Sequence, residues 1–150
     1  MSALLQVGRA VERVDGAEKV TGQAIFGADV RLPGMLYGRV LRAPHPHARV
    51  VRIDTRKAEA LPGVLAVITA EDLPSLQAGQ STAMGEVGLN VVYLADMVLC
   101  RGRVRWKGHP VAAVAAVSPH IAEEALQLIE VEYEVLEPVV DVLQAMQPGS

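Results

Sequence analysis

The sequence predicts an α+β domain with a mixed sheet and two helices, and three observations lead to that fold class. Val111 to Val117 is an apolar run without a polar residue, which is typical of a central strand covered on both faces. Two stretches, Val50–Thr69 and Val111–Leu136, each follow a strand–helix–strand pattern. Strands outnumber helices along the rest of the chain, which favours an α+β arrangement over a regularly alternating one.

The overall composition indicates one globular domain with an aliphatic core. The 150 residues are 51% hydrophobic but only 3% aromatic, which is enough apolar material for a single core. The net charge of −3 gives no basic footprint for nucleic acid, so nucleic acid is not an expected partner.

Cysteine content and hydropathy bear on location. The single cysteine, Cys100, excludes a disulfide within the chain and favours a reducing compartment. No apolar run approaches the ~20 residues that a membrane helix needs, and the first residues lack the features of a secretion signal. We therefore expect a cytoplasmic protein without a membrane partner.

The N-terminal part of the chain has weak apolar periodicity. Glycines and charged residues dominate residues 1–22, which predicts an extended arm that lies on another surface. A short strand is expected around Ala24–Phe26. Leu32–Gly34 predicts a turn, because proline sets its first central torsion and glycine accepts a positive one. Met35–Ala43 then predicts a strand.

The first strand–helix–strand unit follows. Val50–Asp54 alternates as a strand does, and Arg56–Ala60 predicts a short helix that Asp54 or Thr55 can cap. A Pro-Gly pair ends this helix. Val64–Thr69 is the next expected strand.

The middle of the chain is polar and then apolar again. Ser75–Leu89 contains three glycines among Ser, Thr and Gln, which predicts a long loop. Val91–Cys100 and Val104–Trp106 are expected to form a strand pair between the two units.

The second strand–helix–strand unit contains the longer helix. Ser118 can cap a helix whose first turn holds Pro119, where proline is tolerated best. One apolar stripe runs along this helix, made by Ile121, Ala122, Ala125, Leu128 and Ile129. Residues 131–135 then alternate between apolar and Glu, which predicts a strand with one wet face. Asp141–Met146 could begin another helix.

His45 and His47 are the first candidate metal ligands. Alternate residues of a strand share a face, so the two imidazoles could converge on one ion. Prolines flank them, however, and a site needs three or four ligands, none of which lies close in sequence. A loop contact is the favoured interpretation of this pair.

Gly108 and His109 are the candidates for the rim of an active site, because they precede the apolar strand. His109 could act as an acid/base group or as a polar rim residue, since imidazole titrates near neutrality. The favoured alternative is a turn histidine whose nitrogens are satisfied by backbone groups. His120, in the first turn of an amphipathic helix, is expected on the surface.

Other chemistry is not evident in the chain. Cys100 could be a nucleophile, but it follows an apolar run and a buried, inert thiol is favoured. The glycines form neither a dinucleotide fingerprint nor a phosphate loop. We therefore assign no catalytic, cofactor-binding or metal-binding residue.

Four stretches together point to a known family. They are R-V-D-G-A-E-K-V-T-G-Q-A-I-F-G-A-D-V (13–30), L-P-G-M-L-Y-G-R-V-L-R-A-P-H-P-H-A-R-V (32–50), A-L-P-G-V-L-A-V-I-T-A-E-D-L-P (60–74) and V-R-W-K-G-H-P-V-A-A-V-A-A (104–116). Their order and spacing resemble the N-terminal part of the molybdenum-binding large subunit of the xanthine dehydrogenase and aldehyde oxidase family. The stretch A-E-E-A-L-Q-L-I-E-V-E-Y-E (122–134) fits the same pattern.

The resemblance implies an α/β hammerhead fold with the element order β-β-α-β-β-β-α. It also implies an arm at 1–22, a hammerhead domain at 23–146, and an end at 147–150 that is truncated before molybdopterin-binding domains. The expected partners are those downstream domains and an iron–sulfur subunit, and an FAD subunit could join them. The family reaction is hydroxylation of an aldehyde or N-heterocycle carbon with oxygen from water.

The resemblance transfers no catalytic residue, because the family's glutamate base and pterin-binding loops lie beyond position 150. The parent enzyme would hold molybdopterin and molybdenum, with iron–sulfur clusters on partners, whereas this fragment alone is expected to bind no cofactor and to be inactive. The alternative is a free-standing, non-catalytic interaction or ligand-binding module with the same fold.

Overall fold

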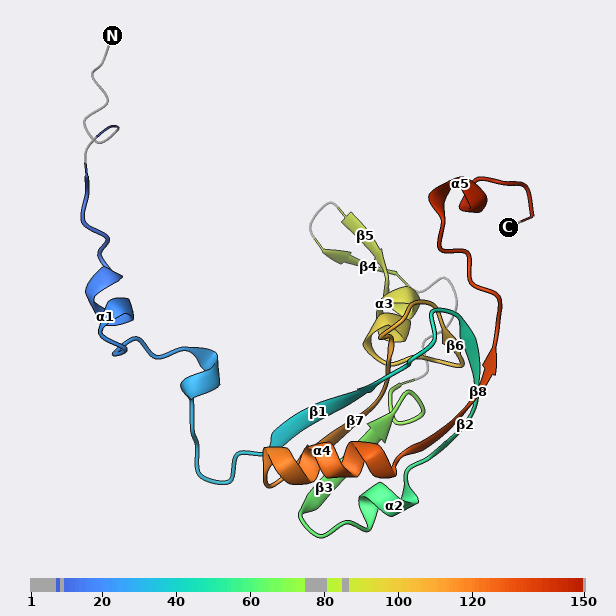
Figure 1. The fold of residues 1–150 in the computed structure, drawn as a ribbon, viewed down its shortest axis with the longest axis horizontal. Coiled ribbons are helices and arrows are strands. Elements are labelled where there is room, and N and C mark those ends of the chain that lie inside the picture. The colour runs from blue at the N-terminus through green and yellow to red at the C-terminus, as the bar shows by residue number, and fades with distance from the viewer. Residues whose placement is uncertain (1–7, 9, 75–80, 85–86, 150) are drawn as a thin grey trace. The chain divides into compact units, whose positions relative to one another are not determined.

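The computed structural model describes residues 8, 10–74, 81–84 and 87–149, and the chain divides into two compact units, Met1–Met35 and Leu36–Ser150. The described part of the first unit holds a helix, α1 (Gly16–Val20), and a 3₁₀ turn, η1 (Gly27–Asp29) (Figure 1). The strand expected at Ala24–Phe26 is therefore wrong, whereas the arm at 1–22 contains a short helix and its place on another surface stays a prediction. Ion pairs of Asp15 with Arg13 and Lys19 support the short helix, which periodicity alone does not indicate.

The apolar run does form the central strand of a sheet. This sheet has the order β1-β7-β3, formed by Tyr37–Arg42, Pro110–Ala116 and Val64–Thr69. Both neighbours run antiparallel to β7, so that Ala113 lies between Val40 and Ile68. The three predicted strands are confirmed.

A second sheet has the order β6-β2-β8, formed by Arg103–Val104, Ala48–Asp54 and Glu130–Val135. All pairings among the described strands are antiparallel. The predicted single mixed sheet is therefore wrong in detail, because the described strands form separate antiparallel sheets. Each strand–helix–strand unit places its two strands in different sheets, so neither unit makes a parallel pair. Instead β2 pairs with β8 and β3 pairs with β7.

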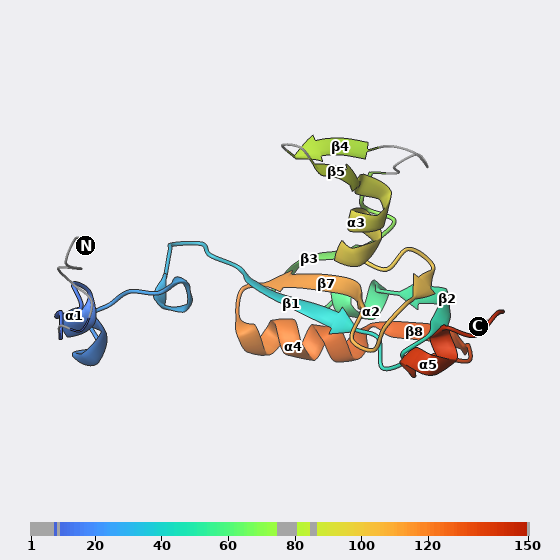
Figure 2. The same cartoon turned by 90° about the horizontal axis from the view of Figure 1, so that it is seen from above.

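Two predicted helices cover one side of this arrangement. They are α2 (Arg56–Glu59) and α4 (Pro119–Leu128), which contact each other. The Ser118 side chain accepts a hydrogen bond of 3.2 Å from the N–H of Ile121, which confirms the predicted cap. Figure 2 shows α4 lying along one side of the β1-β7-β3 sheet.

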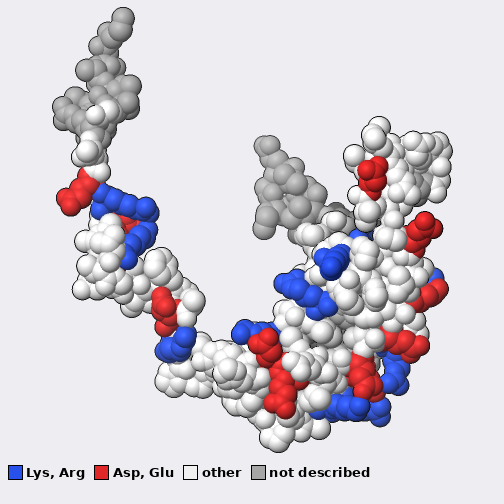
Figure 3. Space-filling view, in the orientation of Figure 1, with Lys and Arg blue, Asp and Glu red and all other residues white. Residues whose placement is uncertain are grey.

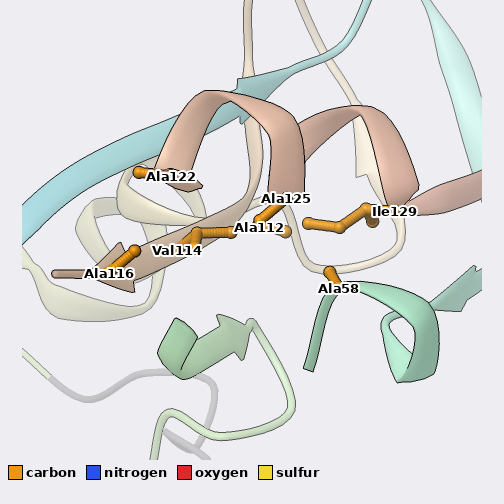
Figure 4. Close-up of a cluster of buried hydrophobic side chains, with 7 residues drawn as sticks. All are labelled: Ala58, Ala112, Val114, Ala116, Ala122, Ala125 and Ile129. Carbon is orange, nitrogen blue, oxygen red and sulfur yellow. The ribbon is translucent and has the colours of Figure 1, made fainter. Parts of the chain in front are cut away.

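The main core lies between α4, α2 and β7 and consists mostly of alanine (Figure 4). Its buried members are Ala58, Ala112, Val114, Ala116, Ala122, Ala125 and Ile129. Side chains of this size let helix and strand backbones approach closely, so a small aliphatic set suffices for a dry core. This core contains no aromatic residue among its buried members, as the aliphatic composition of the chain predicts.

The two faces of β7 are covered unequally. Ala112, Val114 and Ala116 face the main core and are buried, whereas outside that core Val111 is buried and Ala113 and Ala115 are only partly buried. In the same row as Ala113, Ile68 is 40% exposed. The expectation of cover on both faces therefore holds at Val111 but not at Ala113 and Ala115, where part of an apolar sheet face stays open.

The middle of the chain differs most from expectation. Val91–Val98 is a helix, α3, and not a strand, because the Asn90 side chain caps it by accepting a hydrogen bond of 3.1 Å from the N–H of Tyr93. Within the expected loop, Ser81–Met84 (β4) and Val87–Asn90 (β5) form a hairpin. The rest of that loop, 75–80 and 85–86, lies outside the described residues.

A fifth short helix, α5 (Val142–Ala145), confirms the helix start expected after Asp141. The described chain therefore has five α-helices, of which α1 and α3 were not expected. None of the helices in the described ranges is long and apolar enough to cross a membrane.

Candidate functional site

The turn before β7 is where the sequence places its candidate rim residues, Gly108 and His109. Gly108 adopts a positive φ of 91°, which favours glycine. Its N–H donates to the carbonyl of Ala43 at 2.9 Å, and the Ala43 N–H donates to the carbonyl of His109 at 2.9 Å. These two bonds hold the turn against the end of β1.

The His109 side chain is fully buried, and both ring nitrogens are engaged. Nε2 lies 2.7 Å from the carbonyl oxygen of Asp96 and donates to it, while the backbone N–H of Arg105 donates to Nδ1 at 3.3 Å. One face of the ring stacks on Trp106, with centroids 3.8 Å apart and planes inclined by 24°. The ring therefore connects three parts of the chain: α3, the segment that follows β6, and the turn that precedes β7.

Asp96 completes this buried network, although it lies inside an apolar helix. It is 7% exposed, and its carboxylate accepts hydrogen bonds from Arg105 Nε at 2.7 Å and from the Arg101 N–H at 2.9 Å. The hydrogen bond to Asp96 raises the pKa of Arg105. A buried carboxylate with these partners is satisfied and acts as a structural anchor.

The network agrees with the interpretation of His109 as a turn histidine whose ring nitrogens are satisfied by backbone groups. Its ring has no nitrogen open to solvent, so it cannot exchange a proton with a small molecule unless the turn opens. The rim position of Gly108 and His109 in a larger assembly stays a prediction. Sequence reasoning missed Asp96 and Trp106, and the lone carboxylate within V-V-Y-L-A-D-M-V-L-C was the observation that could have revealed them.

His45 and His47 serve separate contacts. The ring of His45 meets Tyr133 edge-on, with centroids 5.2 Å apart, whereas His47 Nδ1 donates to the carbonyl oxygen of Glu137 at 2.8 Å. Loop contacts of this kind are what the sequence favoured. His120 is exposed, as predicted.

Cys100 is 2% exposed and lies in a second cluster of buried residues with Ala43, Ala48, Val104 and Val111. Burial raises the pKa of its thiol to about 11, and the nearby Asp96 carboxylate adds to the shift. The thiolate is the nucleophilic form and is therefore scarce at neutral pH. This geometry agrees with the inert thiol that the sequence favoured.

The described residues do not fit a metal or a metal-bearing cofactor as ligands. Within the described ranges no group of three or more His, Cys, Asp and Glu side chains could hold a metal ion. The one thiol is buried and protonated, and His47 and His109 are engaged with backbone groups. This part of the chain therefore offers packing surfaces, and no chemistry of a bound metal can be derived from its own side chains.

Comparison with known sequences gives a family match. A sequence model described as "Aldehyde oxidase and xanthine dehydrogenase, a/b hammerhead domain" matches residues 21–137. The chain is 44% identical over 138 residues to a probable xanthine dehydrogenase subunit from Bacillus subtilis (strain 168). That match covers 92% of this chain and 17% of the relative.

Solved structures show the same architecture. The chain superposes on the Cu,Mo-CO dehydrogenase with a TM-score of 0.76 and 34% identity, over 95% of this chain and 17% of that one. For the quinoline 2-oxidoreductase from Pseudomonas putida 86 the TM-score is 0.79 at 38% identity, over 95% and 18% of the two chains. In each case the match is to a small part of a much longer chain.

Proposed function

The chain belongs to the aldehyde oxidase and xanthine dehydrogenase family, as its α/β hammerhead domain, and we propose that it is a structural and interface domain of a molybdenum hydroxylase large subunit. The observation that carries the proposal is the match over residues 21–137, together with a relative of which the chain spans only 17%. The predicted hammerhead fold is confirmed by the same match and by the superposition on solved members. No observation favours the free-standing alternative.

In this proposal the parent enzyme hydroxylates an aldehyde or an N-heterocycle carbon with oxygen from water. Molybdopterin and molybdenum are held by other domains of the large subunit. An iron–sulfur subunit and an FAD subunit or domain carry the electrons away. The assembly is cytoplasmic, which is consistent with the single, reduced cysteine.

Exposed apolar surfaces support an interface role. The open face of the β1-β7-β3 sheet has no charged residue in the row of Val40, Ala113 and Ile68. On α3, Tyr93 is 52% and Val98 61% exposed. Apolar side chains exposed on a sheet face and on a helix are consistent with contacts to other protein.

Several ion pairs, in contrast, lie on another side of the domain. Figure 3 shows Lys and Arg interspersed with Asp and Glu along the side formed by α4, α2 and β8. Lys57 pairs with Glu130 there, and Arg49 Nη1 lies 2.7 Å from Glu134 Oε2. Paired charges in water contribute little to stability but keep a surface soluble.

The test compares two kinds of variant in the complete parent complex. Single alanine substitutions of His45, His47, Cys100 and His109 should each leave the kcat of assembled complex within about threefold, whereas loss of a general acid or base costs about 10²–10⁴-fold. Ala125→Leu, which overpacks the core, should reduce the yield of complex without changing the specific activity of what assembles. A loss of kcat above about a hundredfold for any of the four, with assembly intact, would contradict the structural role.

A further inference from the structure

The segment 101–107 carries an unusual concentration of cations for an acidic chain. Its sequence R-G-R-V-R-W-K places a positive side chain at every second position, in a chain of net charge −3. Two of the four have structural duties. Arg101 donates to the carbonyls of Leu73 and Pro74 at 3.2 and 3.1 Å, and Arg105 pairs with the buried Asp96.

The other two, Arg103 and Lys107, are exposed and have no carboxylate partner among the described residues. Both line a groove of about 820 Å³ together with Arg105 and Trp106. The remaining walls are formed by Pro46, His47, Glu137, Pro138, Val139, Val140 and Ala145. Three cations thus meet one carboxylate in this groove, and Val140 offers apolar surface that is 79% exposed.

Sheet topology places the walls of the groove. β6 and β8 are the two edges of their sheet, so the segments that follow them form the two walls, with Pro46 and His47 before β2 between them. An α-helix with its side chains is about 10–12 Å across, so a space bounded by neighbouring strand ends favours a single extended polypeptide.

We propose that this groove binds an extended, acidic segment of a protein partner. Asp or Glu side chains of the segment pair with Arg103 and Lys107, and an apolar or proline residue between them packs on Trp106 and Val140. That the partner belongs to a molybdenum hydroxylase assembly rests on the proposed function. The chemistry by which the groove recognises an acidic segment is independent of it. Arginine and tryptophan are the residue types that partner sites favour most.

Single-stranded nucleic acid is the rival for a basic groove with an aromatic side chain, because bases stack on such rings. Here one face of Trp106 is already covered by His109. The net charge of −3 also opposes the long-range attraction of a polyanion. An acidic peptide carries fewer charges than a nucleic acid and can pack on the part of Trp106 that lines the groove without stacking a base on the ring, so it fits both observations.

Photo-crosslinking in the purified parent complex tests the proposal directly. A benzophenone amino acid at position 107 should crosslink to a segment with two or more Asp or Glu residues, identified by mass spectrometry. The same probe at Lys57, which pairs with Glu130 on another surface, should not yield that product. A crosslink at position 107 only to segments without acidic residues, or none at all, would overturn the proposal.

Charge reversal provides the second arm. Arg103→Glu with Lys107→Glu should weaken binding of a fluorescein-labelled Glu-rich 12-residue peptide by about tenfold or more and remove its salt dependence. The matched control, Arg52→Glu with Lys57→Glu, changes net charge equally at residues outside the groove and should leave the affinity unchanged.

Two further probes separate the sources of negative charge. A 12-residue oligothymidylate or inorganic phosphate that binds more tightly than the peptide, and competes with it, would overturn the choice of partner. Equal affinity of both double variants for the peptide would overturn the site itself. Activity of the parent complex is measured in parallel. If the groove does not bind the peptide but the complex is fully active, only the groove proposal is refuted and the proposed function is not.

Discussion

Gly63 offers a sharp test of the packing between the two strand–helix–strand units. It adopts a φ of 93°, and its carbonyl accepts a hydrogen bond of 2.9 Å from the N–H of Val117. A Cβ at this position would lie 2.8 Å from Ile121 Cδ1 and 3.0 Å from Val117 Cγ2. Gly108 has nearly the same φ, 91°, but a Cβ there would meet nothing within 4 Å.

Substitution by alanine therefore has a similar backbone cost at both glycines, but only at Gly63 does it add a steric clash. An alanine held at positive φ costs about 1–2 kcal/mol in the folded state, and the lost flexibility of the unfolded chain returns about 0.4–1 kcal/mol in both cases. Gly63→Ala adds overpacking of about 1–3 kcal/mol. The Ile121 methyl can move, but the stiff β-branched Val117 cannot move as easily. We expect Gly63→Ala to be the more destabilising by about 1–3 kcal/mol.

Urea denaturation of the two variants and the parent chain measures this difference. With an m-value of about 1–3 kcal/mol per molar, the midpoint for Gly63→Ala should lie roughly 1 M below that for Gly108→Ala. Equal midpoints would show that α4 and the turn before β3 do not pack as described.

Four further outcomes are expected. Ala116→Leu, in the closed core, should destabilise the chain by about 1–3 kcal/mol, whereas Ala113→Leu on the open face should cost less than about 1 kcal/mol; equal urea midpoints would contradict the one-sided cover of β7. Cys100 should react with iodoacetamide at pH 8 about a hundredfold more slowly folded than in urea, because burial raises its pKa to about 11; equal rates measured by mass spectrometry would refute its burial. The hydrogen bond from Arg56 lowers the pKa of Asp54, so its stabilising contribution is present above pH ~4 and is lost as the pH falls through the lowered value. Asp54→Asn should therefore lower the Tm at pH 7 and lower it progressively less as the pH falls from about 4 towards 2, and a constant difference across that range would exclude this linkage. Deletion of residues 1–22 from the parent subunit should abolish co-purification of the iron–sulfur partner, and an intact, active complex would exclude that role for the arm.

Elements whose pattern is decided locally were predictable from the sequence. β7 is continuously apolar, and α4 has both a Ser-Pro start and an apolar stripe, so local chemistry and tertiary position agree. The Gly108–His109 turn was predictable as a backbone-satisfied turn for the same reason. Its glycine and the proline that follows restrict the backbone before any tertiary contact forms.

The remaining features depend on tertiary contacts that no short window contains. α3 is eight residues long, a length at which an apolar run fits a strand or a helix equally well. The separation of β2 from β3 into different sheets follows from pairing with β8 and β7, far along the chain. The buried network was missed because Asp96 and His109 are 13 positions apart and meet only when α3 packs beside the turn.

The pairing of early strands with late ones has a consequence during translation. β1 and β3 both wait for β7, and β2 waits for β6 and then β8, so neither main sheet can begin until about two-thirds of these residues have been synthesised. The stretch between Thr69 and Ala116 takes on the order of 2–10 s at about 5–20 residues per second. For that interval the nascent chain carries three unpaired strands, among them the apolar β3, and unpaired strands of this kind aggregate when unprotected. We therefore expect ribosome pausing within 70–109 to lower the yield of folded protein far more than pausing after Val135.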